Sequence, residues 1–542
     1  MNKNFWKPPY YYFDKKVRGP FTIPAGIVTT RKEIIELIAW EIPEVGILTT
    51  KSTSLNPREG KKEPIIGYAG QYSLFNEVRL ANLGAEKTAE FLSKLNIPKN
   101  KAIVGSVIGS TPEEVKSVAV ILAPYVDVIE INVSCPNDEK AGLAVGQDAI
   151  LVHKIVSAVV DAVKPKPVTV KIAASLDIYS VVVVSKEAGA SGIVAINTDG
   201  PKEYNHNGHL VLKGGESGEK IFKLLLRTVK TLQGLLSVCP NIYPCGGIGS
   251  ARQIRTLVEA KAQFVGTGIG TAIGGMRLQE KKLFFNILMD DLRKGKNNAK
   301  EFRHDFSEMK YRKRTVTGIK EISEDVFTIT LNGTIKINPG QFIFAMIPEK
   351  GEKPFSALDV NSKSFSLLIQ KRRYFTKELS ELNNGDDIYI RGPHGRSPRL
   401  QGRILLVGGG TGVAGLYLFA KEYKNTFAIL GAKEKIPYFG MFSTFCKKVL
   451  PIIENQEERR RLVTDCLDYF IESIKPDYVL NCGPKEMVMK AIEIERKYLS
   501  EDKILSATEE ITKCGESVCG SCATPKGYCS CVDGPFMTAD KI

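Results

Sequence analysis

The sequence predicts a multidomain protein of α/β and β class. A parallel (β/α)8 barrel comes first, followed by an antiparallel β-barrel, a second α/β domain and a small cysteine-rich domain. Three observations predict this order: strands and helices alternate over the first 300 residues, short strands then follow one another, and cysteines gather near the C-terminus. The chain has 542 residues, too many for one hydrophobic core. We expect the domains to span residues 1–305, 306–400, 401–505 and 506–542.

The first 300 residues repeat a strand followed by a helical stretch. This repeat length is typical of a parallel sheet, and the number of units fits a TIM barrel. The expected strands include residues 101–104, 126–133, 168–172, 192–196, 241–244 and 262–265. Because such barrels carry their chemistry at the C-terminal strand ends, the polar residues after each run are the candidates.

Several of those strand ends carry reactive or phosphate-binding residue types. Cys135 lies in the motif NVSCPN, and Lys171 ends the next strand. Late glycines, Gly246–Gly247 and those of the segment 266–270, expose backbone N–H groups of the kind that hold a phosphate. Each glycine alone more often marks a turn, but the late strand ends are where a barrel phosphate site belongs.

These motifs resemble the catalytic subunit of class 1 dihydroorotate dehydrogenase. NVSCPN, TTKSTSLNPREG, INTDG, GGESG and CGGI carry the resemblance, which covers about residues 17–300. It implies an FMN site made of Gly26, Lys51, Ser52, Ser106, Asn132, Lys171, Ile196, Gly218, Gly246, Gly247, Gly268 and Ile269, with Gly270–Thr271 as the alternative at the phosphate. It implies substrate contacts from Lys51, Asn76, Leu80, Asn132, Asn137, Asn197 and Thr198.

Oxidising a C–C bond beside a carbonyl needs a base and a hydride acceptor, and a flavin is such an acceptor. Cys135 is the expected base, and Lys51 is expected to offset negative charge on flavin and substrate. A small buried strand-end residue is the alternative reading of Cys135. Arg79 stands where the family has glycine, and Asp199 where leucine is common, so both bear on the exact substrate.

From about residue 311 short strands alternate with turns, which predicts a small antiparallel barrel. The motifs PGQF, KPFS and GPHG resemble the FAD domain of ferredoxin-reductase-type proteins. The resemblance implies FAD contacts from Lys353, Pro354, Phe355, Ser356 and Thr376. Lys353 replaces the usual arginine, so a point charge replaces a bidentate fork.

The run RILLVGGGTG is a strand that enters a glycine-rich turn before an apolar helix. That context is typical of a Rossmann-like nucleotide-binding unit. The later motif NCGP resembles the nicotinamide site of such reductases. NAD is therefore expected at Gly408, Gly409, Gly410, Gly412, Cys482 and Gly483.

Cys514, Cys519 and Cys522 have the spacing C-x4-C-x2-C of plant-type ferredoxins, which predicts a [2Fe–2S] cluster. The fourth ligand is Cys531 or Cys529. A structural zinc site is the alternative, but zinc usually takes two C-x2-C pairs. Residues 311–542 resemble the electron-transfer subunit of type B dihydroorotate dehydrogenase, in which Cys531 is favoured. The chain thus resembles a fusion of these two subunits.

The resemblance implies oxidation of dihydroorotate to orotate, with electrons passing from FMN through [2Fe–2S] and FAD to NAD+. Alternatives are another pyrimidine such as dihydrouracil, another electron acceptor, and a redox sensor or scaffold. The net charge is +15, but the cations are spread along the chain, so no nucleic-acid partner is expected. We expect no membrane span, a cytoplasmic location and a homo-oligomer.

Overall fold

The computed structural model describes all residues except 1–2, 136–142, 236–240, 434–438, 455–461 and 509. The chain forms two compact units. The first comprises Met1–Ser307 with Glu516–Gly520, and the second comprises Glu308–Gly515 with Ser521–Ile542. Each unit is described separately below.

The first unit contains a parallel eight-stranded sheet with the order β13-β10-β9-β8-β7-β4-β3-β14. An isolated parallel bridge from Cys245 to Gly268 joins the two outer strands and closes the ring. The strands are β3 (Phe21–Ile23), β4 (Val45–Thr49), β7 (Ala102–Val107), β8 (Val128–Asn132), β9 (Val168–Ile172), β10 (Gly192–Ala195), β13 (Ile242–Pro244) and β14 (Thr267–Gly268). The predicted TIM barrel is therefore confirmed.

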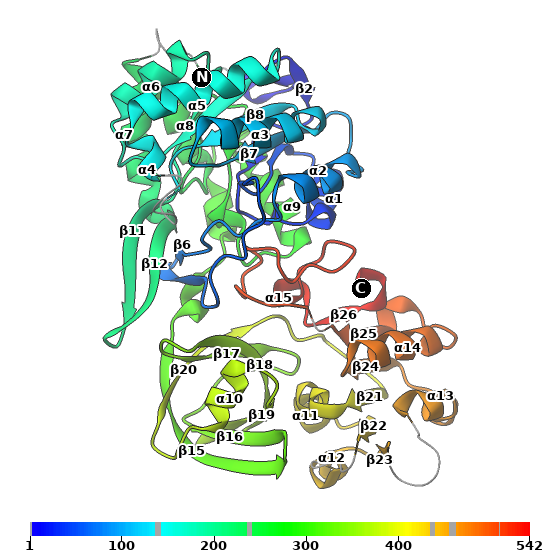
Figure 1. The fold of residues 1–542 in the computed structure, drawn as a ribbon. Coiled ribbons are helices and arrows are strands. Elements are labelled where there is room, and N and C mark those ends of the chain that lie inside the picture. The colour runs from blue at the N-terminus through cyan, green and yellow to red at the C-terminus, as the bar shows by residue number, and fades with distance from the viewer. Residues whose placement is uncertain (1–2, 136–142, 236–240, 434–438, 455–461, 509) are drawn as a thin grey trace. The chain divides into compact units, whose positions relative to one another are not determined.

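Helices follow the strands and cover the outside of this barrel (Figure 1). They are α1 (Lys32–Glu41), α2 (Ala85–Ser93), α3 (Pro112–Leu122), α4 (Leu143–Gly146), α5 (Ala149–Val163), α6 (Ile178–Glu187), α7 (Phe222–Gln233), α8 (Ala251–Glu259) and α9 (Leu278–Lys294). Helix α5 shows why they form: the Asp148 carboxylate caps the Leu151 N–H, and Val152, Ile155, Val156 and Val159 bury one stripe.

One predicted strand is displaced along the chain. Residues 262–265 are not a strand, and β14 begins after them at Thr267. The cause is a turn: Gly266 has φ +97° and donates its N–H to the carbonyl of Pro20. Phe264 is instead buried against the rings of Trp6 and Phe21, so its apolar character serves an aromatic cluster.

A second, antiparallel sheet of the first unit was not predicted. Its strand order is β11-β12-β6-β5, and β11 and β12 form a long hairpin that projects from the barrel (Figure 1). Its strands are β5 (Ile66–Gly70), β6 (Ser73–Asn76), β11 (Asp199–His206) and β12 (His209–Gly218), and a further small hairpin is β1 (Tyr10–Tyr12) with β2 (Lys15–Val17). In this sheet β6 ends at Asn76 and β12 ends at Gly218, and both residues belong to the predicted site of the barrel.

The second unit begins with a closed antiparallel barrel, as predicted, ordered β15-β16-β19-β18-β17-β20. Its strands are β15 (Arg312–Ser323), β16 (Val326–Asn332), β17 (Phe342–Ile347), β18 (Gly351–Val360), β19 (Ser364–Gln370) and β20 (Asp387–His394), with helix α10 (Tyr374–Ser380). Alternate residues such as Phe327, Ile329 and Leu331 point into one buried core, as a period of two requires.

A six-stranded sheet follows, ordered β23-β22-β21-β24-β25-β26, parallel except for its last pair. Its elements are β21 (Ile404–Gly409), α11 (Val413–Glu422), β22 (Thr426–Ala432), α12 (Phe439–Phe445), β23 (Lys448–Ile453), α13 (Leu467–Ile474), β24 (Tyr478–Cys482), α14 (Lys485–Glu495), β25 (Ile504–Ala507), α15 (Ser530–Asp533) and β26 (Phe536–Thr538). Across the described part of the chain, every helix is too short or too polar to cross a membrane.

Candidate active site

The predicted FMN residues of the barrel lie at the C-terminal ends of neighbouring parallel strands. Asn132 ends β8, Lys171 lies near the end of β9, and Ser106 lies near the end of β7. Lys51 and Ser52 follow β4 directly. Because β4, β7, β8 and β9 are adjacent and parallel, these side chains reach the same mouth.

A buried hydrogen-bond network joins the predicted polar residues of this mouth. The hydroxyls of Ser52 and Ser106 are 3.0 Å apart, and the Asn132 amide donates to the Ser52 hydroxyl at 3.0 Å. The Asn197 side-chain amide in turn donates to the side-chain oxygen (Oδ1) of Asn132 at 3.2 Å. Four of the predicted residues thus form one chain of contacts, and low local dielectric makes such a network stiff.

Two members of this network were missed by sequence reasoning. The Ser106 hydroxyl donates to the buried carboxylate of Glu130 at 3.1 Å, and Ser134 receives a bond from the Asn197 amide at 3.2 Å. The signal for Glu130 was present, because a charged residue stands in the otherwise apolar strand VIEIN. A buried carboxylate needs partners, so its position already implied a polar barrel interior.

Two lysines place positive charge beside Cys135. Burial lowers the pKa of Lys51, and the nearby Cys135 partly offsets that effect. Burial would also lower the pKa of Lys171, but the charges of Glu130, Cys245 and Cys135 outweigh it, so its pKa is raised. Lys171 therefore remains a cation in the barrel interior.

Cys135 itself is 7% exposed and packs with Leu80 and Ile108. Leu80 belongs to the predicted substrate loop, where both Arg79 and Leu80 have left-handed φ values, +52° and +56°. The structure therefore brings one predicted substrate residue against the predicted base. Asn137, another predicted substrate contact, lies outside the described residues.

The other predicted substrate residues are also placed. The Asn76 amide donates to the carbonyl of Gly215 in β12 at 3.0 Å, and the Thr198 N–H donates to the Asn197 side chain at 2.9 Å. The Arg79 guanidinium pairs with the buried carboxylate of Glu77 at 2.7 Å. The same carboxylate also pairs with the Lys61 ammonium at 2.5 Å, so Glu77 is the shared counter-ion of both cations.

Gly26, Ile196 and Gly246 complete the set near the mouth. A Cβ on Gly26 would lie 3.6 Å from the Lys51 Nζ, so the glycine lies beside that lysine. A Cβ on Gly246 would lie 3.1 Å from Ile196 Cγ1, which shows that these two residues are in contact.

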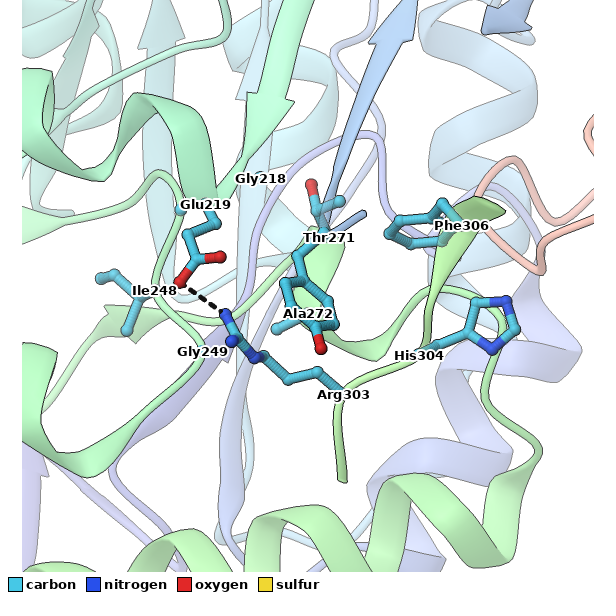
Figure 2. A pocket seen from close by; sticks show the side chains of 11 residues that line it. Gly218, Glu219, Ile248, Gly249, Thr271, Ala272, Arg303, His304 and Phe306 are labelled. Carbon is cyan, nitrogen blue, oxygen red and sulfur yellow. Dashed lines mark ion pairs between the residues drawn. The ribbon is translucent and has the colours of Figure 1, made fainter. Parts of the chain in front are cut away.

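A pocket lies beside the ends of β13 and β14, the last two strands of the barrel (Figure 2). Gly218, Gly247, Gly249 and Thr271 line it, together with Tyr72, Glu219, Ile248, Ala272, Arg303, His304 and Phe306. Gly268 and Ile269 are not among the lining residues, and the Ile269 N–H is bonded to the carbonyl of Thr22. Of the two predicted segments, the pocket lining thus includes Thr271 of the second.

Arg303 is a cation of this pocket that sequence reasoning missed. Its guanidinium pairs with Glu219 at 3.0 Å and lies 3.9 Å from the centre of the Tyr72 ring (Figure 2). It follows the last barrel helix in a charged stretch without a motif, so no local signal marked it.

The nucleotide-site residues of the second unit converge across two of its domains. Gly408 of β21 is paired with Cys482 of β24, and a Cβ on Gly412 would lie 2.5 Å from the Cys482 carbonyl oxygen. A Cβ on Gly415 would lie 3.1 Å from the Cys482 sulfur and 3.5 Å from the Ser356 hydroxyl. The predicted NAD and FAD residues therefore meet at Gly415.

Comparison with known proteins supplies the family. The family model described as dihydroorotate dehydrogenase matches residues 11–283. The chain belongs to the dihydroorotate dehydrogenase family. Another part is 32% identical over 239 residues to a probable dihydroorotate dehydrogenase B (NAD(+)), electron transfer subunit, from Thermococcus kodakarensis, covering 43% of this chain and 98% of that protein.

Two further matches concern the catalytic part. The dihydroorotate dehydrogenase B (NAD(+)), catalytic subunit, of Methanothermobacter thermautotrophicus is 31% identical over 267 residues, covering 47% of this chain and 84% of that protein. A solved dihydroorotate dehydrogenase from Eimeria tenella, in complex with ferulenol, is 16% identical with a TM-score of 0.43, covering 52% of this chain and 84% of that one. This member of the family thus joins, in one chain, a part similar to a catalytic subunit and a part similar to an electron-transfer subunit.

Family membership implies a flavin, and the glycines that line the pocket fit a flavin phosphate. A Cβ on Gly218 would lie 2.2 Å from the Tyr72 carbonyl oxygen, and one on Gly247 would lie 2.5 Å from the Gly218 carbonyl oxygen. Both glycines have positive φ values, +93° and +69°. Only glycine fits such a close backbone turn, which is how exposed N–H groups approach a phosphate.

The cysteines of the electron-transfer part also fit an iron–sulfur cluster by their chemistry. Cys514, Cys522, Cys529 and Cys531 are all buried, and the sulfurs of Cys522 and Cys531 are 3.2 Å apart. Within the described residues, no three His, Cys, Asp or Glu side chains are arranged around a single metal ion. Because the four thiolates of a [2Fe–2S] cluster are shared between two irons, three protein side chains need not surround a single ion. Cys529 and Cys531 both lie in the segment, so the choice between them stays open.

Proposed function

We propose that this protein oxidises dihydroorotate to orotate and passes the electrons to NAD+. The observation that supports this most directly is the buried Cys135 thiol, which interacts electrostatically with both Lys51 and Lys171 at the mouth of the barrel. FMN held at the barrel mouth would supply the acceptor for the hydride from C6 of the substrate, and a [2Fe–2S] cluster held by the C-terminal cysteines, with FAD in the second unit, would supply onward electron carriers to NAD+. The names of the relatives support the acceptor.

The residues of the barrel have separate roles in this proposal. Cys135 removes the proton from C5, and the charges of Lys51 and Lys171 favour negative charge on its sulfur. Asn132 and Asn197, fixed by the hydrogen bond between them, present donors and acceptors to the pyrimidine edge. Leu80 packs on Cys135 and keeps water from the thiol.

The base role of Cys135 is tested by replacing it with alanine. The purified Cys135→Ala protein should keep its flavins, because Cys135 is not one of the residues predicted to hold FMN. Anaerobic stopped-flow reduction by dihydroorotate should slow by about 10²–10⁴-fold, the usual loss for a general base. Cys446→Ala is the matched control, because Cys446 is a buried thiol of the nucleotide domain. Wild-type reduction rates in Cys135→Ala would exclude Cys135 as the base.

The substrate carboxylate should also be recognised by charge. Lys51 and Lys171 lie at the mouth, whereas Arg79 shares the Glu77 carboxylate with Lys61. Dihydroorotate should therefore reduce the enzyme much faster than dihydrouracil, which lacks the carboxylate. Parallel steady-state assays measure the ratio of kcat/KM. Preference for dihydrouracil would instead support the alternative pyrimidine.

A further inference from the structure

A fully buried guanidinium lies in the antiparallel barrel of the second unit. The Arg391 side chain is 0% exposed, and so is that of Glu352, with which it forms a two-pronged ion pair. The Arg391 Nε is 2.9 Å from Glu352 Oε2, and Nη2 is 2.7 Å from Oε1. The Tyr311 hydroxyl donates to the same Oε2 at 2.7 Å. A buried ion pair of this kind is seldom kept for stability alone.

The remaining nitrogen of Arg391 connects the barrel to the cysteine-rich segment. Its Nη1 donates to the main-chain carbonyl of Cys514 at 3.1 Å and lies 3.1 Å from His394 Nε2 and from Met309 Sδ. Cys514 is the first cysteine of the C-x4-C-x2-C motif. The fixed fork of a guanidinium lets one side chain hold both a carboxylate and this carbonyl.

The next residue of the segment is fitted to the same wall. Gly515 has φ +83°, and a Cβ there would lie 3.0 Å from Phe344 Cε2 and 3.1 Å from His394 Nδ1. The Arg391 guanidinium stacks on the Phe344 ring, 3.7 Å from its centre. Adjacent strands β18, β17 and β20 therefore supply Glu352, Phe344 and Arg391 as one platform under Cys514 and Gly515.

We propose that Arg391 is a positioning residue for the iron–sulfur segment: held by Glu352 and Tyr311, it fixes the Cys514 carbonyl and so orients the first cluster ligand. This inference rests on the cluster of the proposed function. Partners outside the ligand set commonly determine how firmly a metal is held and how it is tuned. The barrel wall thereby takes part in the electronic properties of a cluster that it does not ligate.

The test uses the complete chain with the substitution Arg391→Lys. Lysine keeps a positive charge for Glu352 but cannot also reach the Cys514 carbonyl with a fork. The matched control is Arg312→Lys, on the neighbouring strand β15, where the arginine is partly exposed. Iron, sulfide and flavin contents, the electron paramagnetic resonance spectrum of the reduced cluster and its midpoint potential are measured.

In Arg391→Lys, a chelator should remove iron about 10-fold faster than from wild type, and the spectrum and potential of the remaining cluster should shift. Arg312→Lys should match wild type. If Arg391→Lys does not fold, Tyr311→Phe, which removes one bond to Glu352, carries the same readouts. A cluster unchanged in iron release, spectrum and potential in the tested variant overturns the proposal. Wild-type protein without iron and sulfide overturns the proposed cluster itself, which separates the two failures.

Discussion

At the scale of single residues, we expect Glu495 to make the six-stranded-sheet domain of the second unit sensitive to pH. Its side chain is fully buried, and burial raises its pKa to about 8. The Asn481 amide donates to one of its oxygens at 2.8 Å. Because the folded pKa is above the ordinary value of 4.5, the protonated form stabilises the fold. This contribution is complete below the unfolded pKa and is lost as the pH rises through about 8.

The substitution Glu495→Gln should remove this loss. The variant keeps the shape and an acceptor for Asn481 but cannot ionise, so its melting temperature should fall less than that of wild type between pH 6 and pH 9. Each unit of raised pKa corresponds to about 1.4 kcal/mol. Differential scanning calorimetry across this range measures the effect. Glu493→Gln is the control, since Glu493 is an exposed residue of the same helix. Parallel melting curves for wild type and Glu495→Gln would contradict the assignment.

At the scale of elements, the turn after β13 shapes the pocket that we expect to hold the flavin phosphate. Gly247 lines the pocket with a positive φ, and the backbone of Gly218 and Phe222 occupies the space where its side chain would be. Two elements therefore build the pocket: β12 supplies Gly218, and the turn after β13 supplies Gly247.

Gly247→Ala should therefore reduce flavin binding to the barrel. A methyl group would force the turn apart and would also strain φ, which costs about 1–2 kcal/mol for a left-handed residue. We expect a lower FMN content with little change in FAD, measured by release of both flavins after denaturation. Gly234→Ala is the control. Gly234 caps the end of α7 with a helical φ, and a Cβ added there would have its nearest contact at 3.4 Å. Full FMN content in Gly247→Ala would show that the turn does not shape the site.

At the scale of the whole molecule, one chain contains both halves of the proposed electron path. We expect purified protein to contain about one FMN and one FAD, with two irons and two sulfides for each chain. Cofactor extraction combined with iron and sulfide analysis tests this directly. A preparation with zinc in place of iron would instead support the structural-metal alternative.

Much of this organisation could be predicted from the sequence, because periodicity and motif spacing are local properties. Strand runs such as β9 and motifs such as NVSCPN were recognised for that reason. The hairpin β11–β12 was not, because β11 is polar and buries little surface, while β12 contains glycines and lacks an alternating apolar pattern. The contacts of Arg303 with Glu219, of Arg391 with Cys514 and of Ser134 with Asn197 join segments far apart in the chain, so no local pattern marks them.

The short seam of the (β/α)8 ring has a thermodynamic consequence. β13 spans three residues, β14 spans two, and a single bridge joins them, beside the glycine pocket. A phosphate bound between the loops that follow β13 and β14 would link these two strands where the barrel wall has its shortest pairing. Because a ligand that binds only the folded state stabilises it by mass action, heat resistance of the catalytic half and occupancy by its prosthetic group should rise and fall together.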